Sequence, residues 1–483
     1  MTSPDAADHR FRQVGKPVTM PLRSRGVLSR LVHAGALVSS DIVAAFVASG
    51  LAFKLAHMIS ELLRDHQFVS LSKAVQDRAP FAFPVLLVCA LWMHSRGHYS
   101  ERIPFWSEVR DVISAAALCL VAEGFIEYAA KEHVSRLWVA ISWALYIPIC
   151  VLVRSWIKWA LTRLAIRRMD VFLFGDPEGP VRTAIEAETL LGFKVVGASI
   201  DAHAGDAAHL VRRSGARMAV IAMGGDSDIQ ATSIAHHLSH EGVPFALCPP
   251  LGGLGLASMR PLVLFGHDAV LLVERRGLDN PVARVIKRLV DVMCSMLGLI
   301  VLGPVAVTFA MLVALDGGNP FYAQTRVGRR GRMIRVWKIR SMVLDADQRL
   351  ASLLASDPQA RDEWARDRKL KQDPRTTRIG RFMRTSAIDE IPQLWNVLAG
   401  EMSLVGPRPV VAAELERYGD AARIYLGVNP GLTGLWQVSG RNDTTYDRRI
   451  ELDAWYVRNW SLWIDAVVLM KTLPALMVRR GAY

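Results

Sequence analysis

The chain has 483 residues, of which 51% are hydrophobic, and a formal net charge of +13. Its mean hydropathy of +0.22 is high for a soluble protein, and its length is enough for two or three domains. The positive charge indicates anionic partners, namely lipid head groups, nucleotides or nucleic acid. The five cysteines are scattered without a CxxC pair, which argues against a disulfide framework or a zinc site.

Residues 1–30 form a basic tail, which we predict to be cytoplasmic because it has neither the apolar core nor the cleavage site of a signal peptide. Four apolar stretches follow. Each of them, the second together with its flanks, is about long enough to cross roughly 30 Å of hydrocarbon. We therefore predict a bundle of four transmembrane helices over residues 31–168. The stretches centre on residues 36–58, 80–94, 109–130 and 137–160.

Isolated charged residues such as Asp41 and Glu123 interrupt these apolar stretches. Ionisable groups inside a membrane either pair within a helix bundle or line a path for ions, and we predict pairing here. Basic residues gather in or beside the second loop, at Arg96, Arg102 and Arg110, and again after the fourth stretch. Because basic loops stay in the cytoplasm, we expect both ends of the bundle on that side.

Residues 169–280 predict an α/β module, because four strand-like segments alternate with helical ones, as in a parallel sheet. The first turn runs from Gly175 to Gly179 and lacks the GxGxxG fingerprint. Asp176 and Glu178 stand where a pyrophosphate would need bare backbone N–H groups. We therefore predict a Rossmann-like module with a structural or regulatory role and no dinucleotide. Its strands are expected at residues 171–175, 193–201, 218–225 and 243–250.

The last region, residues 281–483, opens with an apolar run over 292–315 that contains Pro304. A proline inside a helix removes a backbone hydrogen bond and kinks the helix. Both flanks of the run are basic, which favours the cytoplasm for both. A fifth spanning helix would put one flank outside. We therefore predict a re-entrant membrane helix-hairpin over about 286–315, with its break at Pro304.

The rest of this region is predicted to be mainly α-helical and to lie against the membrane. Residues 321–342 read as a hairpin with basic residues around its turn. Residues 455–480 mix Trp and Tyr with Arg and Lys around an apolar face, which is typical of an amphipathic helix in the plane of the interface. The predicted fold class is thus a membrane protein of mixed α and α/β structure.

An acidic pair, Asp389 and Glu390, stands at the start of a predicted helix in the segment TSAIDEIPQLWN. Ser386 and Asp389 fit a capping box, and acids and a proline such as Pro392 are common in a first turn. Taken alone, the segment therefore favours a structural role. Adjacent helical residues point about 100° apart, so the two carboxylates could also take different chemical roles.

Arginines around the acidic pair favour a chemical role. A series of arginines at three-residue spacing ends at Arg384, and Pro407 and Pro409 hold a stiff loop around Arg408, which suits a guanidinium presented to a phosphate. Glycine-rich turns with Arg441 follow. Carboxylates and arginines beside a membrane indicate phosphoryl transfer with a divalent metal. The alternative for the arginines is a surface that contacts lipid.

Two segments, 384–409 (RTSAIDEIPQLWNVLAGEMSLVGPRP) and 431–472, closely resemble the bacterial sugar transferases. These are monotopic polyprenyl-phosphate phosphosugar transferases, which start the assembly of O-antigen, capsule and exopolysaccharide. The resemblance is specific over 281–483, looser over 170–275 and only topological before that, as in the large members of the family. It implies transfer of hexose-1-phosphate, from UDP-galactose or UDP-glucose, to undecaprenyl phosphate with release of UMP.

The resemblance also implies roles for single residues. Asp389 matches the nucleophile that carries the phosphosugar covalently, and Glu390 matches its partner near Mg²⁺, for which Mn²⁺ could substitute. Arg384 matches a basic residue of the site, although Ala387 and Ile388 stand where the family usually has Ser-Leu. Pro407, Arg408 and Pro409 match a loop associated with the uridine nucleotide, Lys338 and Arg441 fall in matching motifs, and Pro304 matches the break in the re-entrant helix.

The family further implies the bacterial inner membrane, a catalytic domain on the cytoplasmic side and a homodimer. A rival class is a non-catalytic scaffold that binds anionic lipid through its basic faces, which would need the charges but not Asp389. Nucleic-acid binding would explain the net charge but leaves the apolar segments unused. No recognition motif for nucleic acid is visible, so we expect none as a partner.

Overall fold

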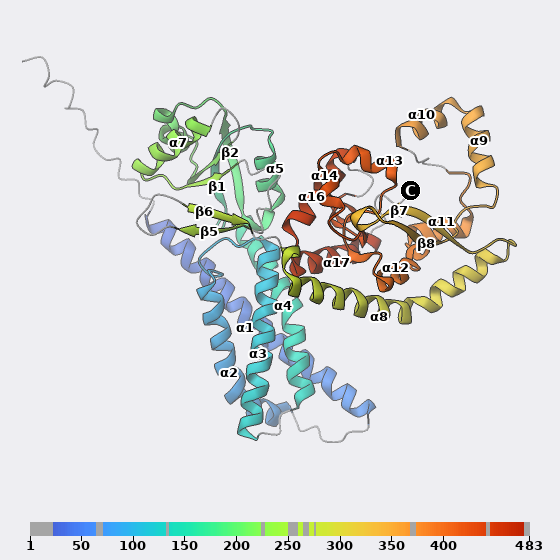
Figure 1. Cartoon of the computed structure of the whole chain (residues 1–483). Helices are drawn as coiled ribbons and strands as arrows, with labels where there is room; N and C mark the ends of the chain where they lie inside the picture. Colours follow the sequence, from blue (N-terminus) through green and yellow to red (C-terminus); the bar gives the residue numbers. More distant parts are fainter. Residues whose placement is uncertain are drawn as a thin grey trace, which may run out of the picture. The chain divides into compact units, whose positions relative to one another are not determined.

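The computed structural model describes residues 23–63, 71–131, 135–223, 228–249, 259–263, 270–274, 277–367, 373–440 and 445–477 (Figure 1). The chain divides into two compact units, residues 1–250 and 251–483. Most of the predicted basic tail and Arg441, one of the predicted site residues, lie outside the described residues.

Four long helices form the first part of unit 1, and each contains one of the predicted apolar stretches (Figure 1). Helix α1 packs against α4, α4 against α3, and α3 against α2. Together with α8 of the other unit, they are the five helices in the described part of the chain that are long and apolar enough to cross a membrane. The four are α1 (Arg23–Leu62), α2 (Leu71–Ser95), α3 (Phe105–Ala130) and α4 (Arg136–Arg163).

The charges inside these helices are paired, as predicted. The Arg78 guanidinium lies 2.7 Å from the Glu123 carboxylate, which also accepts a hydrogen bond from Trp143. Asp41 lies 2.5 Å from Arg154, whose side chain is fully buried. Buried ion pairs of this kind satisfy groups that would otherwise be very unfavourable in an apolar environment.

The α/β module completes unit 1 with a four-stranded sheet in the order β2-β1-β3-β4, in which every neighbouring pair is parallel. This confirms the predicted strands and their direction. Gly175 (φ +146°) follows β1, and a Cβ atom there would lie 2.7 Å from the Cβ of Ala222, so the two strand ends approach too closely for any larger residue. The N–H of Glu178 donates to Asp176, so the chain's own side chain occupies this turn. The elements are β1 (Met169–Phe174), α5 (Pro180–Ala187), β2 (Phe193–Ser199), α6 (Ala207–Arg213), β3 (Met218–Ala222), α7 (Asp228–His240) and β4 (Phe245–Cys248).

Unit 2 begins with an antiparallel pair of strands, β5 (Met259–Val263) and β6 (Val270–Glu274), which the sequence did not predict. Helix α8 (Pro281–Ala314) follows, and the side chain of Asn280 caps it by accepting from the N–H of Val282. The helix continues through Pro304 and changes direction along its length (Figure 1). The predicted break at Pro304 is therefore wrong, because a proline can bend a helix without ending it.

One side of the first half of α8 is bound to the rest of unit 2 by polar contacts. Lys287 lies 2.6 Å from Asp465, and Arg288 donates to the last carbonyls of α12, those of Val397 and Leu398. Asp291 accepts hydrogen bonds from the segment that follows α12. The other side of α8 exposes large apolar side chains. They include Met293, Leu297, Ile300, Val301 and Met311.

The rest of unit 2 is mainly helical around the predicted hairpin, which is confirmed as β7 (Phe321–Val327) and β8 (Met333–Ile339). Its core is formed by side chains that include Ile339, Met383, Val397 and Val468. The remaining elements are α9 (Ala346–Ser356), α10 (Pro358–Asp367), α11 (Arg378–Thr385), η7 (Ile388–Glu390), α12 (Gln393–Ala399), β9 (Ser403–Val405), α13 (Ala412–Leu415), α14 (Ala421–Tyr425), β10 (Gly431–Thr433), α15 (Leu435–Val438), α16 (Tyr446–Asn459) and α17 (Leu462–Met477).

Candidate active site

Two segments that are distant in sequence build the acidic site, which we define as Tyr322, Lys338, Arg384, Asp389 and Glu390. Tyr322 and Lys338 are opposite each other on β7 and β8. Arg384 belongs to the last turn of α11, and the two acids lie in the 3₁₀ turn η7. The hairpin and η7 are in contact, so the strand residues and the acids come together.

Asp389 lies in the turn between α11 and α12. Ala387 adopts a left-handed conformation (φ 54°), which reverses the chain after α11. Pro392 then stands at the N-cap of α12. Ser386 is the C-cap of α11, and its hydroxyl donates to the carbonyl of Phe382. The predicted capping box is therefore wrong, because Ser386 ends one helix and does not begin the next.

Asp389 is a buried carboxylate, with 6% of its surface exposed. Its pKa is raised to about 6, first by burial and then by the charge of Glu390, while the charges of Lys338 and Arg384 act in the opposite direction. At neutral pH the group is mostly ionised, and it carries little of the hydration that a surface aspartate has. A poorly solvated carboxylate surrounded by cations is suited to nucleophilic attack.

Glu390 is the partly exposed member of the acidic pair. Lys338 holds one of its carboxylate oxygens at 2.6 Å. Burial lowers the pKa of Lys338, but the carboxylates of Glu390 and Asp389 outweigh this, so its pKa is raised and it stays positively charged. This contact supports the prediction that Lys338 belongs to the site. The sequence alone could not show the contact, because the two residues are far apart in the chain.

Arg384 is the one arginine of its series that reaches the acidic site. Its Nε donates to the Ser341 hydroxyl at 2.8 Å, and its charge lowers the pKa of Asp389. Arg375 is instead paired with Asp373 at 2.7 Å. Arg378 and Arg381 are exposed. The three-residue spacing therefore does not bring the whole series to one place.

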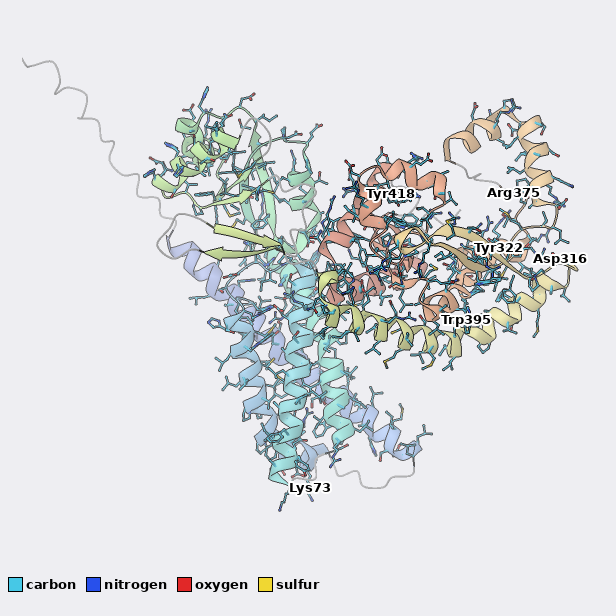
Figure 2. The ribbon with its side chains drawn as sticks, in the orientation of Figure 1. Lys73, Asp316, Tyr322, Arg375, Trp395 and Tyr418 are labelled. Atoms are coloured by element: carbon cyan, nitrogen blue, oxygen red, sulfur yellow. The ribbon has the colours of Figure 1, made fainter. Side chains whose placement is uncertain are left out.

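Tyr322 is a member of the site that sequence reasoning missed. Burial raises its pKa, and the charges of Lys338, Asp389, Arg384 and Glu390 all act on it. Figure 2 labels it on the hairpin beside β8. The register of the hairpin could have identified Tyr322, because it pairs with Lys338 and residues that face each other on paired strands share one face of the sheet.

Arg408 belongs to a second group, the arginine–aromatic cluster, formed by Arg326, Arg408, Trp436, Tyr446 and Arg449. The guanidiniums of Arg408 and Arg449 lie 5.2 and 4.3 Å from the centre of the Trp436 ring, within the range of cation–π attraction. Arg326 is half-buried, and burial together with the charge of Arg408 lowers its pKa. Several positive charges are thus concentrated around one aromatic ring.

The loop that carries Arg408 is fixed by the short parallel pair β9–β10. The carbonyl of Pro407 accepts from the N–H of Gly431, and Gly406 donates to Thr433. Below the loop, the buried Asp453 accepts from the Tyr418 hydroxyl at 2.9 Å. Burial raises the pKa of Asp453 to about 7, against hydrogen bonds from Tyr418 and the backbone of Arg408. The loop is therefore stiff, as Pro407 and Pro409 predicted.

The acidic pair fits a magnesium ion that arrives with a phosphate ligand. Mg²⁺ is commonly held by one or two carboxylates, substrate phosphates and water. Asp389 and Glu390 offer two adjacent carboxylates, and the Glu390 side chain is 37% exposed and so can be reached. In the described ranges, no group of three or more His, Cys, Asp or Glu side chains could hold a metal. Phosphate oxygens would therefore have to complete the ligand set.

The site combines a buried carboxylate, a neighbouring ion pair and concentrated positive charge, which defines a phosphoryl-transfer enzyme as the class of protein. Comparison with known proteins agrees. Residues 282–479 match the family model described as bacterial sugar transferase. An undecaprenyl-phosphate galactose phosphotransferase of Salmonella typhimurium is 35% identical over 427 residues, which are 83% of this chain and 88% of that protein. The chain therefore belongs to the bacterial sugar transferase family, in its large form.

Two further relatives match a smaller part of the chain. An exopolysaccharide production protein of Sinorhizobium fredii is 45% identical over 216 residues, which are 44% of this chain and 96% of the relative. A UDP-glucose:undecaprenyl-phosphate glucose-1-phosphate transferase of Escherichia coli is 34% identical over 217 residues, covering 42% and 44% of the two chains. Residues 94–221 also match a model described as CoA-binding domain. The relative from Salmonella typhimurium is thus matched over most of this chain, whereas the relative from Sinorhizobium fredii is matched by less than half of it.

Proposed function

We propose that the protein transfers a hexose-1-phosphate from a UDP-hexose, UDP-galactose or UDP-glucose, to undecaprenyl phosphate and releases UMP. The observation that carries the proposal is Asp389, a buried carboxylate whose pKa is raised to about 6, set between Lys338 and Arg384 in a transferase of this family. The names of the relatives from Salmonella and Escherichia coli support the substrates. This would be the first membrane step in the synthesis of an exopolysaccharide, capsule or O-antigen.

The reaction would proceed in two displacements. A carboxylate oxygen of Asp389 bonds to the β-phosphorus of the UDP-hexose, and the bond from that phosphorus to the bridging oxygen breaks. UMP leaves with this oxygen and its electron pair. A phosphate oxygen of the lipid then bonds to the same phosphorus, the bond to Asp389 breaks, and the carboxylate is regenerated. The bond between sugar and phosphate oxygen stays intact throughout.

The neighbouring residues would reduce the repulsion between the attacking carboxylate and the phosphates. Arg384 and Lys338 place positive charge beside Asp389, and Lys338 fixes Glu390 next to it. Mg²⁺, or Mn²⁺ in its place, held by Asp389 and Glu390, would neutralise phosphate charge when bound.

The arginine–aromatic cluster would bind the uridine nucleotide. It presents Arg408 from a loop that contains Pro407 and Pro409, and two guanidiniums, those of Arg408 and Arg449, lie close to the Trp436 ring. Arginine forks suit phosphates. Arg441 would belong to the same region of the chain.

We further propose that α1–α4 form a transmembrane bundle in the bacterial inner membrane. Helix α8 would be a re-entrant helix that bends at Pro304. Both of its ends and the acidic site would lie on the cytoplasmic side. The exposed apolar side of α8 supports its insertion, as does Trp395 on the nearby α12, which is 62% exposed (Figure 2). The protein would act as a homodimer.

Labelling of single cysteines tests the course of α8. With all five native cysteines replaced by Ser, a cysteine introduced at position 284, near the start of α8, or at position 329, beyond its end, should react with a membrane-impermeant thiol reagent only in inverted vesicles. Reaction of one of the introduced cysteines from the periplasmic side would mean that α8 spans the membrane.

The activity itself is tested with the purified full chain, undecaprenyl phosphate, Mg²⁺ and a panel of radiolabelled UDP-sugars. Label should enter the lipid from UDP-galactose or UDP-glucose, and not with Asp389→Asn. Without lipid acceptor, intact-protein mass spectrometry should detect a hexose-phosphate adduct. UMP release only in the presence of lipid, with no adduct at any time, would favour direct transfer. A scaffold would bind anionic lipid equally in both variants and would label no lipid.

A further inference from the structure

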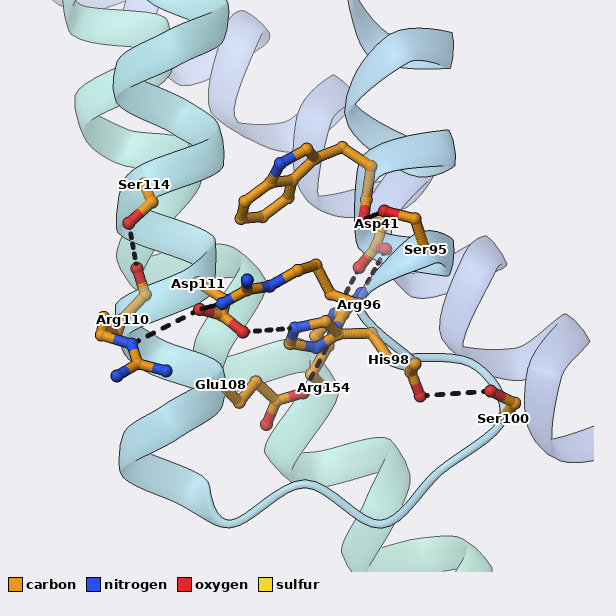
Figure 3. A network of polar contacts seen from close by, with 12 residues as sticks. Asp41, Ser95, Arg96, His98, Ser100, Glu108, Arg110, Asp111, Ser114 and Arg154 are labelled. Atoms are coloured by element: carbon orange, nitrogen blue, oxygen red, sulfur yellow. Dashed lines mark hydrogen bonds and ion pairs between the residues drawn. The ribbon is translucent and has the colours of Figure 1, made fainter. Parts of the chain in front are cut away.

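A hollow with a volume of about 540 Å³ opens between the end of α2 and the start of α3, in unit 1 and away from the acidic site. Its walls are mainly polar. Arg96, Arg110, Asp111, Ser107 and Glu101 are among the residues that line it. Figure 3 shows Arg96 and Arg110 converging on Asp111 from the two helices.

Two arginines and two acids line the hollow. One oxygen of Asp111 lies 3.1 Å from the Arg96 guanidinium and 3.5 Å from that of Arg110. Both arginine side chains are about half exposed, so each guanidinium keeps part of its surface toward the hollow. The exposed Glu101, whose carboxylate lies beside Gly97, is the other acid of the lining. Arg96 and Arg110 share one oxygen of the buried Asp111, and about half of each arginine side chain stays exposed, so these guanidiniums are donors that the hollow offers to a ligand.

A buried network of polar contacts fixes the position of the Asp111 carboxylate. Its second oxygen lies 3.2 Å from His98, whose other ring nitrogen lies 3.2 Å from Arg154 (Figure 3). Arg154 and Lys158 are matched by Asp41 and Glu108. The inner network is therefore balanced without Arg96 and Arg110.

An apolar groove lies between the same two helices, further along them. Its volume is about 130 Å³, and it is lined by apolar side chains that include Val88, Cys89, Trp92, Leu118 and Ala122. Val88 precedes Arg96 by eight residues, which is about 12 Å along a helix. The Arg96 guanidinium lies 5.4 Å from the Trp92 ring and so stands at the junction of hollow and groove.

We propose that the hollow and the groove together bind one phospholipid of the surrounding bilayer, with its anionic phosphate headgroup between Arg96 and Arg110 and an acyl chain in the α2–α3 groove. Guanidiniums are suited to phosphate oxygens through paired hydrogen bonds. An uncapped helix start at Pro104 adds a partial positive charge. The succession of charged and apolar walls matches a lipid and not a soluble anion.

Native mass spectrometry of the purified full chain, titrated with phosphatidylglycerol, tests this site. The wild type should bind one tightly held lipid, at least about tenfold more strongly than phosphatidylcholine, and Arg96→Gln with Arg110→Gln should lose that preference. Arg163→Gln is the matched control, because Arg163 also stacks on a tryptophan, Trp159, at a helix end but does not line the hollow or the groove. Its lipid binding should equal that of the wild type.

A second variant fills the groove and leaves the charges in place. Ala122→Phe should weaken phosphatidylglycerol binding by about tenfold and should leave the binding of soluble glycerol phosphate unchanged. Equal lipid binding by the double arginine variant and the wild type would overturn the proposal. So would equally tight binding of glycerol phosphate, which would make this an anion site only. Displacement of phosphatidylglycerol by undecaprenyl phosphate at equal concentration would also overturn it and would assign the site to the acceptor lipid.

Discussion

Asp389 is the residue whose environment differs most from what its local sequence suggests. The segment around it has the composition of a helix start, and the capping box was a reasonable interpretation. In the structure the residue is buried in a 3₁₀ turn, and no helix begins there. Its carboxylate therefore does not act as a cap, and its burial destabilises the ionised form. This reverses what a substitution should do to stability.

We expect Asp389→Asn to abolish turnover, by about a thousandfold or more, and not to destabilise the protein. The folded pKa of about 6 lies above the usual value of 3.8. The aspartate therefore favours the folded state most below pH 4, and this contribution is lost as the pH rises to about 6. Above that pH the neutral Asn should be more stable by up to about 3 kcal/mol. Thermal unfolding in detergent at pH 5 and pH 8, beside the radiolabel assay, measures both effects.

The acid limb of the pH–rate profile should report the same carboxylate. A nucleophile must be ionised, so turnover should fall as the pH drops through about 6. The charge of Glu390 raises the pKa of Asp389 and that of Arg384 lowers it. Glu390→Gln should therefore move the limb to lower pH, and Arg384→Gln should move it to higher pH. Initial rates from pH 4.5 to 8 test this, and shifts in the same direction in both variants would contradict it.

Sequence reasoning identified Lys338, Arg384, Asp389 and Glu390, and the structure brings these four together. It missed Tyr322, because the register of β7 against β8 becomes visible only when the hairpin is built. It also missed Trp436 and Arg449 as neighbours of Arg408. Such contacts join residues that are far apart in the chain, and no local pattern contains them.

At the scale of single elements, the predictions were most accurate where the apolar segments were long or repeated regularly. The four long helices and the four parallel strands lie where the apolar runs predicted them. The ribbon of β5 and β6 was not predicted, because Pro261 interrupts a run that would otherwise read as a strand. In α8, the proline was taken as a break, whereas the flanking helical turns keep the chain helical and the helix bends.

Two basic residues in the first half of α8 bind other elements of unit 2. Their charge predicted a cytoplasmic flank, but Lys287 is in contact with Asp465 of α17 and with the carbonyl of Val405. Arg288 binds the end of α12. These cations attach α8 to the rest of unit 2. A basic residue that the sequence assigns to a membrane flank can thus also stabilise the internal structure.

We expect Lys287→Met to destabilise unit 2 by about 3 kcal/mol, because it leaves the buried Asp465 without its counter-ion. Tyr456 and Trp460 would still donate hydrogen bonds to Asp465, which limits the loss. Arg284→Met is the matched control, since Arg284 is exposed on the same helix. Thermal unfolding of both variants in detergent measures the difference. An equal effect in the two would mean that the Lys287 contact contributes little.

At the scale of the whole molecule, the chain joins a transferase unit to a unit of helices and a parallel sheet. The relative from Sinorhizobium fredii is matched over nearly all of its length by 44% of this chain, so proteins of the family exist without the additional part. All residues of the acidic site and the arginine–aromatic cluster lie in residues 251–483. The module in unit 1, whose first turn is occupied by Asp176, contributes none of them.

We therefore expect a fragment that contains only the transferase unit to keep measurable turnover. The structure also indicates where such a fragment must begin. Asn280 caps α8, and Leu278 packs against the core of unit 2. A fragment of residues 277–483 keeps both, whereas residues 281–483 lose the cap, which should lower stability by about 1 kcal/mol. Both should label undecaprenyl phosphate in nanodiscs, and the shorter one should unfold at lower temperature. If the longer fragment is folded and membrane-bound but transfers no sugar phosphate, then residues 1–276 take part in forming the active site, and the acidic site described above is incomplete without them.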